Sequence, residues 1–233
     1  MMQEHLRQKQ MKLNQPGHDF YTSRGTHVYF KNQIENPDIS PEAVVASVEE
    51  KIPDHLLSEM EMIIIGHFKE FEERYISAFY KDGILHISNV QESEEDLIDD
   101  IVHEIAHSIE TPYGYEIYAD QRIKSEFLQK RGSLYNKLNA LGYKAPKDWF
   151  TNTEYDEDFD NFLFQTVGRD KLRMICTGLF INAYAATSLR EYFATGFTDF
   201  YLYANKTLLK TISPVLAQKL FFLHDIKNLD ESI

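Results

Sequence analysis

The sequence predicts an α+β fold that is mainly helical, with a small β-sheet in the amino-terminal half. Three segments, 26–30, 61–68 and 83–89, are short runs of apolar or alternating residues of the kind that form strands. Further along the chain, apolar residues recur every three or four positions over long segments, which indicates amphipathic helices. The 233 residues are 43% hydrophobic, which is enough for one sizeable core. We therefore expect a single domain over 18–233, preceded by a polar tail over 1–17.

The expected helices are marked at their starts by capping residues. The segment 40–52 has Ser40 in the capping position and Pro41 as its first helical residue. A second helix should begin near Ser93, because an acid, Asp96, follows it three residues later. Further helical patterns cover 117–142, 187–206 and 213–226.

The charge balance and the single cysteine exclude several classes of protein. The formal net charge is −13 and no Lys/Arg cluster interrupts it, so nucleic acid is not an expected partner. The one cysteine, Cys176, rules out an internal disulfide framework and a Cys-rich zinc module, suits a reducing compartment, and is expected to be a small core residue. There is no apolar run of signal-peptide or membrane-spanning length, so we expect a cytoplasmic protein with no membrane partner.

One helical segment, "IDDIVHEIAHSIE" at 98–110, carries two histidines and a glutamate in an HExxH pattern. At about 100° per residue, His103 and His107 lie on one polar stripe, opposite an apolar face that packs. Two imidazoles four residues apart can bind one metal ion, and Glu104 would lie beside that ion without ligating it. The alternative is that both histidines are ordinary residues of an amphipathic helix. The position of the motif inside a well-marked helix favours a zinc site.

A catalytic zinc takes three protein ligands, so the third must come from elsewhere in the chain. The metzincin continuation needs glycine at position 110 and histidine at position 113, whereas this chain has Glu110 and Tyr113. Glu110 lies too far along the helix to reach the metal, although it could orient a histidine through the second ring nitrogen. Glu191 is a candidate ligand, because it is a carboxylate in the first turn of a strongly hydrophobic helix. The alternative for Glu191 is a surface position favoured by the helix dipole.

Taken together, "HEIAHSIE" and "YAATSLREYFATGF" resemble the catalytic domain of anthrax lethal factor and the related Pro-Pro endopeptidases. In that family a tyrosine precedes the ligand glutamate by seven residues, in a segment of the form Y, six residues, EFFAEAF. Here Tyr184 precedes Glu191 by the same interval (191 − 184 = 7). The resemblance covers roughly 83–204 and implies a zincin-like metallopeptidase fold, in which the edge strand of a small mixed β-sheet precedes the HExxH helix.

The resemblance also implies roles for individual residues. Glu104 would be the general base, Tyr184 a catalytic hydroxyl that stabilises the oxyanion, and Glu110 the counterpart of an aspartate in the relatives. The implied zinc ligands are His103, His107 and Glu191.

This chain departs from the family pattern in two ways. Thr195 and Gly196 stand where relatives have Glu and Ala, so the contacts around the ligand glutamate differ here. The interval of 84 positions from His107 to Glu191 (191 − 107) is also longer, which indicates an insertion that reshapes the substrate cleft.

The expected function is zinc-dependent endopeptidase activity on a protein or peptide substrate, which would add to the strand at 83–89 as to a sheet edge. His86 on that strand is expected to be a packing residue. One alternative is a binding or assembly module that contains a structural zinc, although such a site would be closed by four ligands and the sequence offers no obvious fourth. Another is a zinc amidase that acts on a non-peptide amide.

Overall fold

The computed structural model describes residues 19–74, 76–203 and 206–230. The predicted polar tail, 1–17, lies outside the described residues. The chain divides into two compact units, Met1–Ser108 and Ile109–Ile233. The expectation of a single domain over 18–233 stays a prediction.

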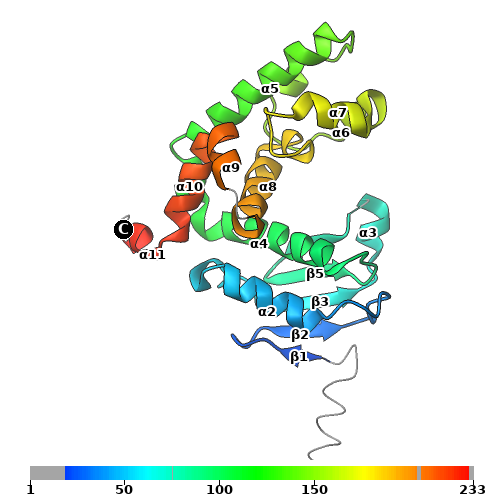
Figure 1. Ribbon diagram of the computed structural model, residues 1–233, viewed down its shortest axis with the longest axis vertical. Coiled ribbons are helices and arrows are strands. Elements are labelled where there is room, and N and C mark those ends of the chain that lie inside the picture. Colours follow the sequence, from blue (N-terminus) through cyan, green and yellow to red (C-terminus); the bar gives the residue numbers. More distant parts are fainter. Residues whose placement is uncertain (1–18, 75, 204–205, 231–233) are drawn as a thin grey trace, which may run out of the picture. The chain divides into compact units, whose positions relative to one another are not determined.

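The first unit contains a five-stranded mixed sheet with the strand order β1-β2-β3-β5-β4 (Figure 1). Strands β2, β3 and β5 run parallel, whereas β1 and β4 are antiparallel to their neighbours. The strands are β1 Phe20–Tyr21, β2 His27–Phe30, β3 Met62–Gly66, β4 Ala78–Lys81 and β5 Ile84–Ser88. The helices are α2 Pro41–Lys51, the 3-10 turn η1 Asp54–Leu56, α3 Lys69–Arg74 and α4 Glu94–Tyr118, which ends in the second unit.

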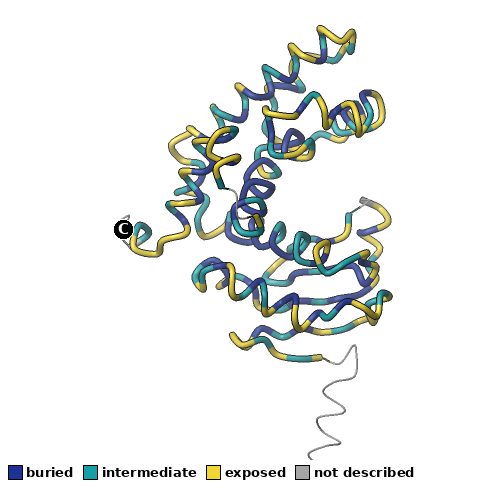
Figure 2. The backbone as a smooth tube through the Cα atoms, viewed as in Figure 1, coloured by how far each residue is buried: buried dark blue, intermediate teal, exposed yellow. Residues whose placement is uncertain are grey.

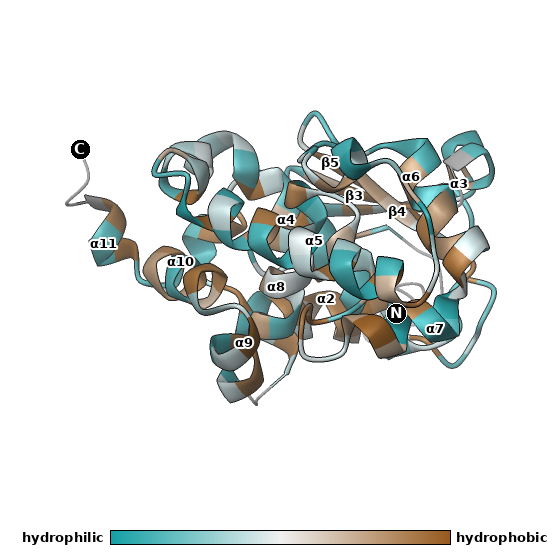
Figure 3. Cartoon of the chain, turned by 90° about the horizontal axis from the view of Figure 1, so that it is seen from above, coloured by the Kyte–Doolittle hydropathy of each residue, from teal (hydrophilic) through white to brown (hydrophobic). Residues whose placement is uncertain are grey.

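The three predicted strands are confirmed as β2, β3 and β5. Strand β3 lies in the middle of the sheet and consists of apolar residues, which Figure 3 shows in brown. The second residue of each of these strands is buried: Val28, Ile63 and Leu85 are at most 1% exposed and lie on one face of the sheet. Ile63 and Leu85 are also paired in the parallel register of β3 and β5, so this face carries the core of the sheet.

The prediction that the strand before the HExxH helix is the sheet edge is wrong. Strand β5 is paired on both sides, and β4 is the outer strand. The reason is a tight hairpin: Asp82 and Gly83, with φ of 50° and 83°, join β4 to β5. Two positive φ values at an Asp-Gly pair are typical of a two-residue hairpin turn. The chain therefore places an extra antiparallel strand outside β5.

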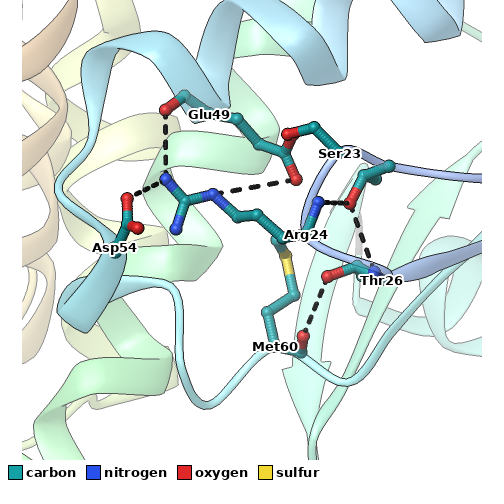
Figure 4. Close-up of polar contacts among 7 residues, drawn as sticks. Ser23, Arg24, Thr26, Glu49, Asp54 and Met60 are labelled. Carbon is teal, nitrogen blue, oxygen red and sulfur yellow. Dashed lines mark hydrogen bonds and ion pairs between the residues drawn. The ribbon is translucent and has the colours of Figure 1, made fainter.

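Helix α2 begins as predicted, with Pro41 first and the Ser40 hydroxyl accepting a hydrogen bond from the Ala43 amide at 3.3 Å. Its last turn is held by Arg24, which donates to the Glu49 carbonyl at 3.5 Å and to the Asp54 carboxylate (Figure 4). A cation at this end of a helix is favoured by the helix dipole. Arg24 thus ties the turn between β1 and β2 to the end of α2.

The second unit is helical in the residues described. Its longer helices are α5 Arg122–Ala140, α7 Arg169–Cys176, α8 Leu189–Leu202 and α10 Pro214–His224. The shorter elements are η2 Lys147–Phe150, α6 Glu157–Asn161, the π-helical η3 Phe162–Gly168, η4 Tyr184–Ala186, α9 Lys206–Ile212 and α11 Ile226–Asp230. With the sheet of the first unit, these helices confirm the predicted α+β class with a mainly helical content.

Helix α8 is the most deeply buried long helix of this unit, as the dark blue of its tube shows (Figure 2). It begins at Leu189 because Ser188 caps it, two residues after the predicted start at position 187. The predicted helix over 117–142 is interrupted, since Gln121 adopts a left-handed conformation with φ of 58° between α4 and α5. Cys176 is 1% exposed, which confirms a core position. Within the described part of the chain, no helix has the length and apolar character that a membrane span needs.

Candidate metal centre

Helix α4 presents the HExxH motif on a regular helical segment. It begins at Glu94, and the Ser93 hydroxyl accepts a hydrogen bond from the Asp96 amide at 3.1 Å, which confirms the predicted start. The apolar side of the helix is buried, with Ile101, Val102 and Ile105 at most 1% exposed. This burial fixes the rotation of the helix, because the apolar stripe must face the core. The polar stripe with both histidines then points away from that core.

The two histidines and Glu191 form one group. The rings of His103 and His107 lie 5.0 Å apart at an angle of 78°, and both residues are half-buried. One ligand atom from each of His103, His107 and Glu191 lies within 4.8 Å of the other two. Such a group could hold a metal ion, as the sequence predicted.

Glu104, between the two histidines in sequence, is fixed by the outer strand of the sheet. Its Oε2 accepts a hydrogen bond from the backbone amide of Tyr80 on β4 at 2.8 Å. Tyr80 faces Leu85 across the ladder. The Ser88 amide donates to the Ser77 carbonyl at 2.7 Å, so the hydrogen-bonded pairs of this antiparallel ladder fall at residues 77, 79 and 81, and Tyr80 lies between two of them. The Tyr80 amide therefore points outward from the sheet, and Glu104 lies at its outer edge.

One helical turn earlier, Asp100 makes a second contact with the same strand region. Its carboxylate accepts from the Ser77 hydroxyl at 2.8 Å and from the Gln91 side-chain amide at 3.1 Å. Burial raises the pKa of Asp100, although these two hydrogen bonds oppose the shift. Asp100 and Glu104 thus hold α4 alongside β4 at two points.

Glu191 lies in the first turn of α8, where its backbone amide donates to the Ser188 hydroxyl at 3.1 Å. Both of its neighbours in sequence are anchored. Arg190 donates from Nε to Glu110 at 2.6 Å, and the Tyr192 hydroxyl donates to Glu126 at 2.7 Å. These contacts restrict the rotation of the first turn about the helix axis, and with it the direction of the Glu191 side chain.

Glu110 is held by two partners of its own unit. Its Oε1 accepts from the Tyr118 hydroxyl and its Oε2 from Arg190. Burial and the neighbouring carboxylate raise the pKa of Tyr118, so its hydroxyl stays a hydrogen-bond donor. Orientation of a histidine by Glu110 stays a prediction. The contact of Glu110 with the residue before Glu191 was not expected from the sequence.

Tyr184 is the first residue of the turn η4 and is 39% exposed. The Thr187 amide and hydroxyl both donate to its carbonyl, at 3.0 and 2.9 Å. The turn places Tyr184 four residues before the capping Ser188, so its backbone is well defined. Its catalytic role stays a prediction.

His86 is a packing residue, as predicted. Its ring stacks on Phe79 with centroids 4.3 Å apart and an angle of 10°, and Phe68 meets it edge-on at 5.0 Å. Burial lowers the pKa of His86, which favours its neutral form between these rings.

The sequence did not point to Tyr80 or to strand β4. The signal for them was present: Asp82-Gly83 between two apolar runs is a strong hairpin pattern. That pattern would have placed a strand beside 83–89 and moved the sheet edge to it.

We compared the chain with protein-family models, with curated proteins and with solved structures, and none of them matches it. The geometry of the group around His103, His107 and Glu191 therefore carries the functional argument.

Proposed function

We propose that this chain is a zinc-dependent endopeptidase. The observation that carries the proposal is the group of His103, His107 and Glu191, with ligand atoms within 4.8 Å of one another and with Glu104 next to His103 on the same helix. Metallopeptidases use two imidazoles and one carboxylate in this way and leave a ligand position open. The resemblance to lethal factor and the Pro-Pro endopeptidases supports the same assignment.

The donor set fits zinc better than a hard cation. Two imidazole nitrogens and one carboxylate oxygen suit Zn²⁺, whereas Ca²⁺ and Mg²⁺ prefer oxygen ligands throughout. When bound, a zinc ion would supply Lewis acidity, which polarises the scissile carbonyl and makes water acidic enough to lose a proton near neutral pH.

The side chains of this chain would perform the proton transfers. Glu104 accepts a proton from the attacking water as the new C–O bond forms, and passes it to the leaving amine as the C–N bond breaks. Its hydrogen bond from Tyr80 holds one carboxylate oxygen in place, which limits the reorganisation that this transfer needs. The Tyr184 hydroxyl donates to the oxyanion of the tetrahedral intermediate.

The outer edge of β4 is the proposed place for the substrate backbone. Among the described residues no strand pairs with that side of β4, and β4 carries the Tyr80 amide that contacts Glu104. Because the Tyr80 amide is already bonded to Glu104, an extended peptide would add to the rest of this edge, and it would then lie next to the general base. This replaces the strand at 83–89, whose two sides are already paired.

The second candidate is a binding or assembly module with a structural zinc. A closed site would need a fourth protein ligand. Within the residues described, the group contains three such residues, which favours the catalytic proposal.

The test is a cleavage profile on a diverse peptide library, with and without a chelator. We expect cleavage that stops on chelation and returns on addition of Zn²⁺. Zinc-loaded protein that cleaves no peptide in the library would contradict the proposal and favour the binding module. Cleavage of non-peptide amides alone would favour the amidase.

A further inference from the structure

Arg131 on α5 is a buried cation that bonds to backbone carbonyls. It is 1% exposed, yet it is among the largest side chains of the core. Its guanidinium carbon lies 4.1 Å from the centre of the Phe159 ring and 5.1 Å from that of Phe127. The guanidinium is therefore enclosed by aromatic rings, which attract a cation but shield it from solvent.

The guanidinium donates to four carbonyls in two segments. Nη1 donates to Ala186 and, at 3.1 Å, to Thr187. Nη2 donates to Trp149 and, at 3.1 Å, to Asn152. The planar fork of an arginine can join two chain segments in this way, whereas the ammonium of a lysine is a point charge.

Both segments hold the start of α8. Ala186 and Thr187 directly precede the capping Ser188, and Thr187 donates to the Tyr184 carbonyl. The other segment continues to Thr153, whose carbonyl accepts a hydrogen bond from the Leu189 amide at 2.8 Å. Arg131 thus lies at the junction that sets the turn of Tyr184 and the first turn of α8.

The buried guanidinium of Arg131 is not expected to add much to the free energy of unfolding. Among the described residues no carboxylate forms an ion pair with Arg131, although the charge of Asp156 favours its cationic form, and its Nε is buried without a hydrogen-bond partner. Burial lowers the pKa of Arg131 to about 9, so the group is still cationic at neutral pH. A buried charge of this kind is often no more stabilising than an apolar side chain of similar volume. What it adds is a fixed geometry for the carbonyls that it joins.

We propose that Arg131 is a positioning residue for the metal centre, because it holds the turn of Tyr184 and the first turn of α8 so that the Glu191 carboxylate meets the two histidines. The inference rests on the proposed zinc function of the group. Glu191 touches the metal in this scheme, and Arg131 acts only through the backbone that carries Glu191.

The neighbouring Lys130 provides a matched control. It is also a buried cation of α5, at 8% exposure, and also donates to carbonyls, those of Leu179 at 2.8 Å and Ile212 at 2.5 Å. These carbonyls belong to neither segment that Arg131 joins. Lys130→Met therefore removes a comparable buried cation and leaves the carbonyls that Arg131 joins with their partner, although it also removes the ammonium 5.8 Å from the centre of the Tyr192 ring on α8.

The experiment measures Co²⁺ affinity by optical titration of metal-free protein, for the wild type, Arg131→Lys and Lys130→Met. We expect Arg131→Lys to weaken Co²⁺ binding by roughly 10- to 100-fold, the range typical of residues that orient metal ligands. Lys130→Met should bind Co²⁺ as the wild type does. The midpoint of denaturant unfolding, measured on all three, shows whether the two variants lose similar stability. Equal affinities in Arg131→Lys and the wild type, or equal losses in both variants, would overturn the proposal.

A measurement on the wild type does not depend on the folding of any variant. The guanidinium NH groups of Arg131, followed by ¹⁵N NMR, should be protected from hydrogen exchange, and their exchange should slow further when Zn²⁺ is added, because the free energy of coupling between two sites is reciprocal. Exchange that is equally fast without Zn²⁺ and at saturating Zn²⁺ would overturn the positioning role.

The outcomes separate this inference from the proposed function. A wild type that binds Co²⁺ and shows the Arg131 effect, but cleaves no peptide, contradicts the endopeptidase and supports the positioning role. A wild type that cleaves peptides while Arg131→Lys keeps full Co²⁺ affinity contradicts the positioning role alone.

Discussion

The carboxylate of Glu104 accepts a hydrogen bond of 2.8 Å from the backbone amide of Tyr80. This contact joins the HExxH helix to the outer strand of the sheet. It places the proposed general base beside the edge to which an extended peptide would add. The same contact makes a conservative test of Glu104 possible, because a glutamine can still accept the Tyr80 hydrogen bond.

We predict that Glu104→Gln abolishes most of the turnover and leaves the fold and the zinc content unchanged. The amide oxygen of glutamine can accept the Tyr80 hydrogen bond but cannot take a proton from water, so kcat should fall by at least about 10²- to 10⁴-fold. The measurement is kcat on one cleavable peptide, with zinc content and circular dichroism as controls. Cleavage at the wild-type rate would mean that another residue is the base.

Glu191→Ala should lose most of the bound zinc, because two imidazoles alone make a weak site. The loss of affinity should exceed the roughly 10- to 100-fold effect of residues that only orient ligands. Glu157→Ala is the matched control, since Glu157 is an exposed glutamate in the first turn of another helix, α6. Full zinc content in Glu191→Ala would exclude Glu191 as a ligand.

The local part of the site could be predicted from the sequence. Helical periodicity alone puts His103 and His107 on one face of a helix, and the capping Ser93 marks where that helix begins. The assignment of Glu191 depended on the resemblance, because no local pattern relates residue 191 to residues 103 and 107.

The parts that depend on tertiary structure could not be predicted in the same way. Strand order is set by which edges pair, and the strand nearest the helix in sequence, β5, proved to be internal. In the sequence, Arg131 is one of several charged residues in an amphipathic helical pattern. Its burial follows from carbonyls at 149, 152, 186 and 187, which no periodicity of α5 reveals.

Glu110→Gln tests whether Glu110, besides its contact with Arg190, also affects the zinc affinity of the site. We expect zinc affinity to fall by roughly 10-fold, because the charge that holds Arg190 next to Glu191 is lost. Asp120→Asn is the control, since Asp120 forms an ion pair of 2.9 Å with Lys219 in the same unit. Zinc affinity that is equal in both variants and the wild type would limit Glu110 to a structural contact.

Cys176 should be unreactive in the folded protein. Burial raises the pKa of its thiol to about 12, so a thiol reagent at pH 8 should react only as the chain unfolds. The folded pKa lies above the unfolded value of about 8.5, so the proton is retained on folding. Stability from this group is therefore present below about pH 8.5 and is lost as the pH rises toward 12. The check compares unfolding of the wild type and Cys176→Ala at pH 7 and pH 10, where the difference between them should shrink.

Tyr184→Phe tests whether the hydroxyl of Tyr184 takes part in catalysis or whether the residue only packs through its ring. Tyr184 is 39% exposed and its backbone is held by Thr187, so loss of the hydroxyl should leave the fold and the zinc content unchanged. If the hydroxyl donates to the oxyanion, kcat should fall by roughly 10²-fold with KM little changed, because the hydrogen bond strengthens only in the transition state. Tyr115→Phe is the matched control, since Tyr115 is 80% exposed and has no proposed catalytic role. Both variants and the wild type would be compared on one cleavable peptide, with bound zinc measured on the same samples. A kcat of Tyr184→Phe equal to that of Tyr115→Phe would remove Tyr184 from the mechanism and leave the metal ligands and Glu104 in place.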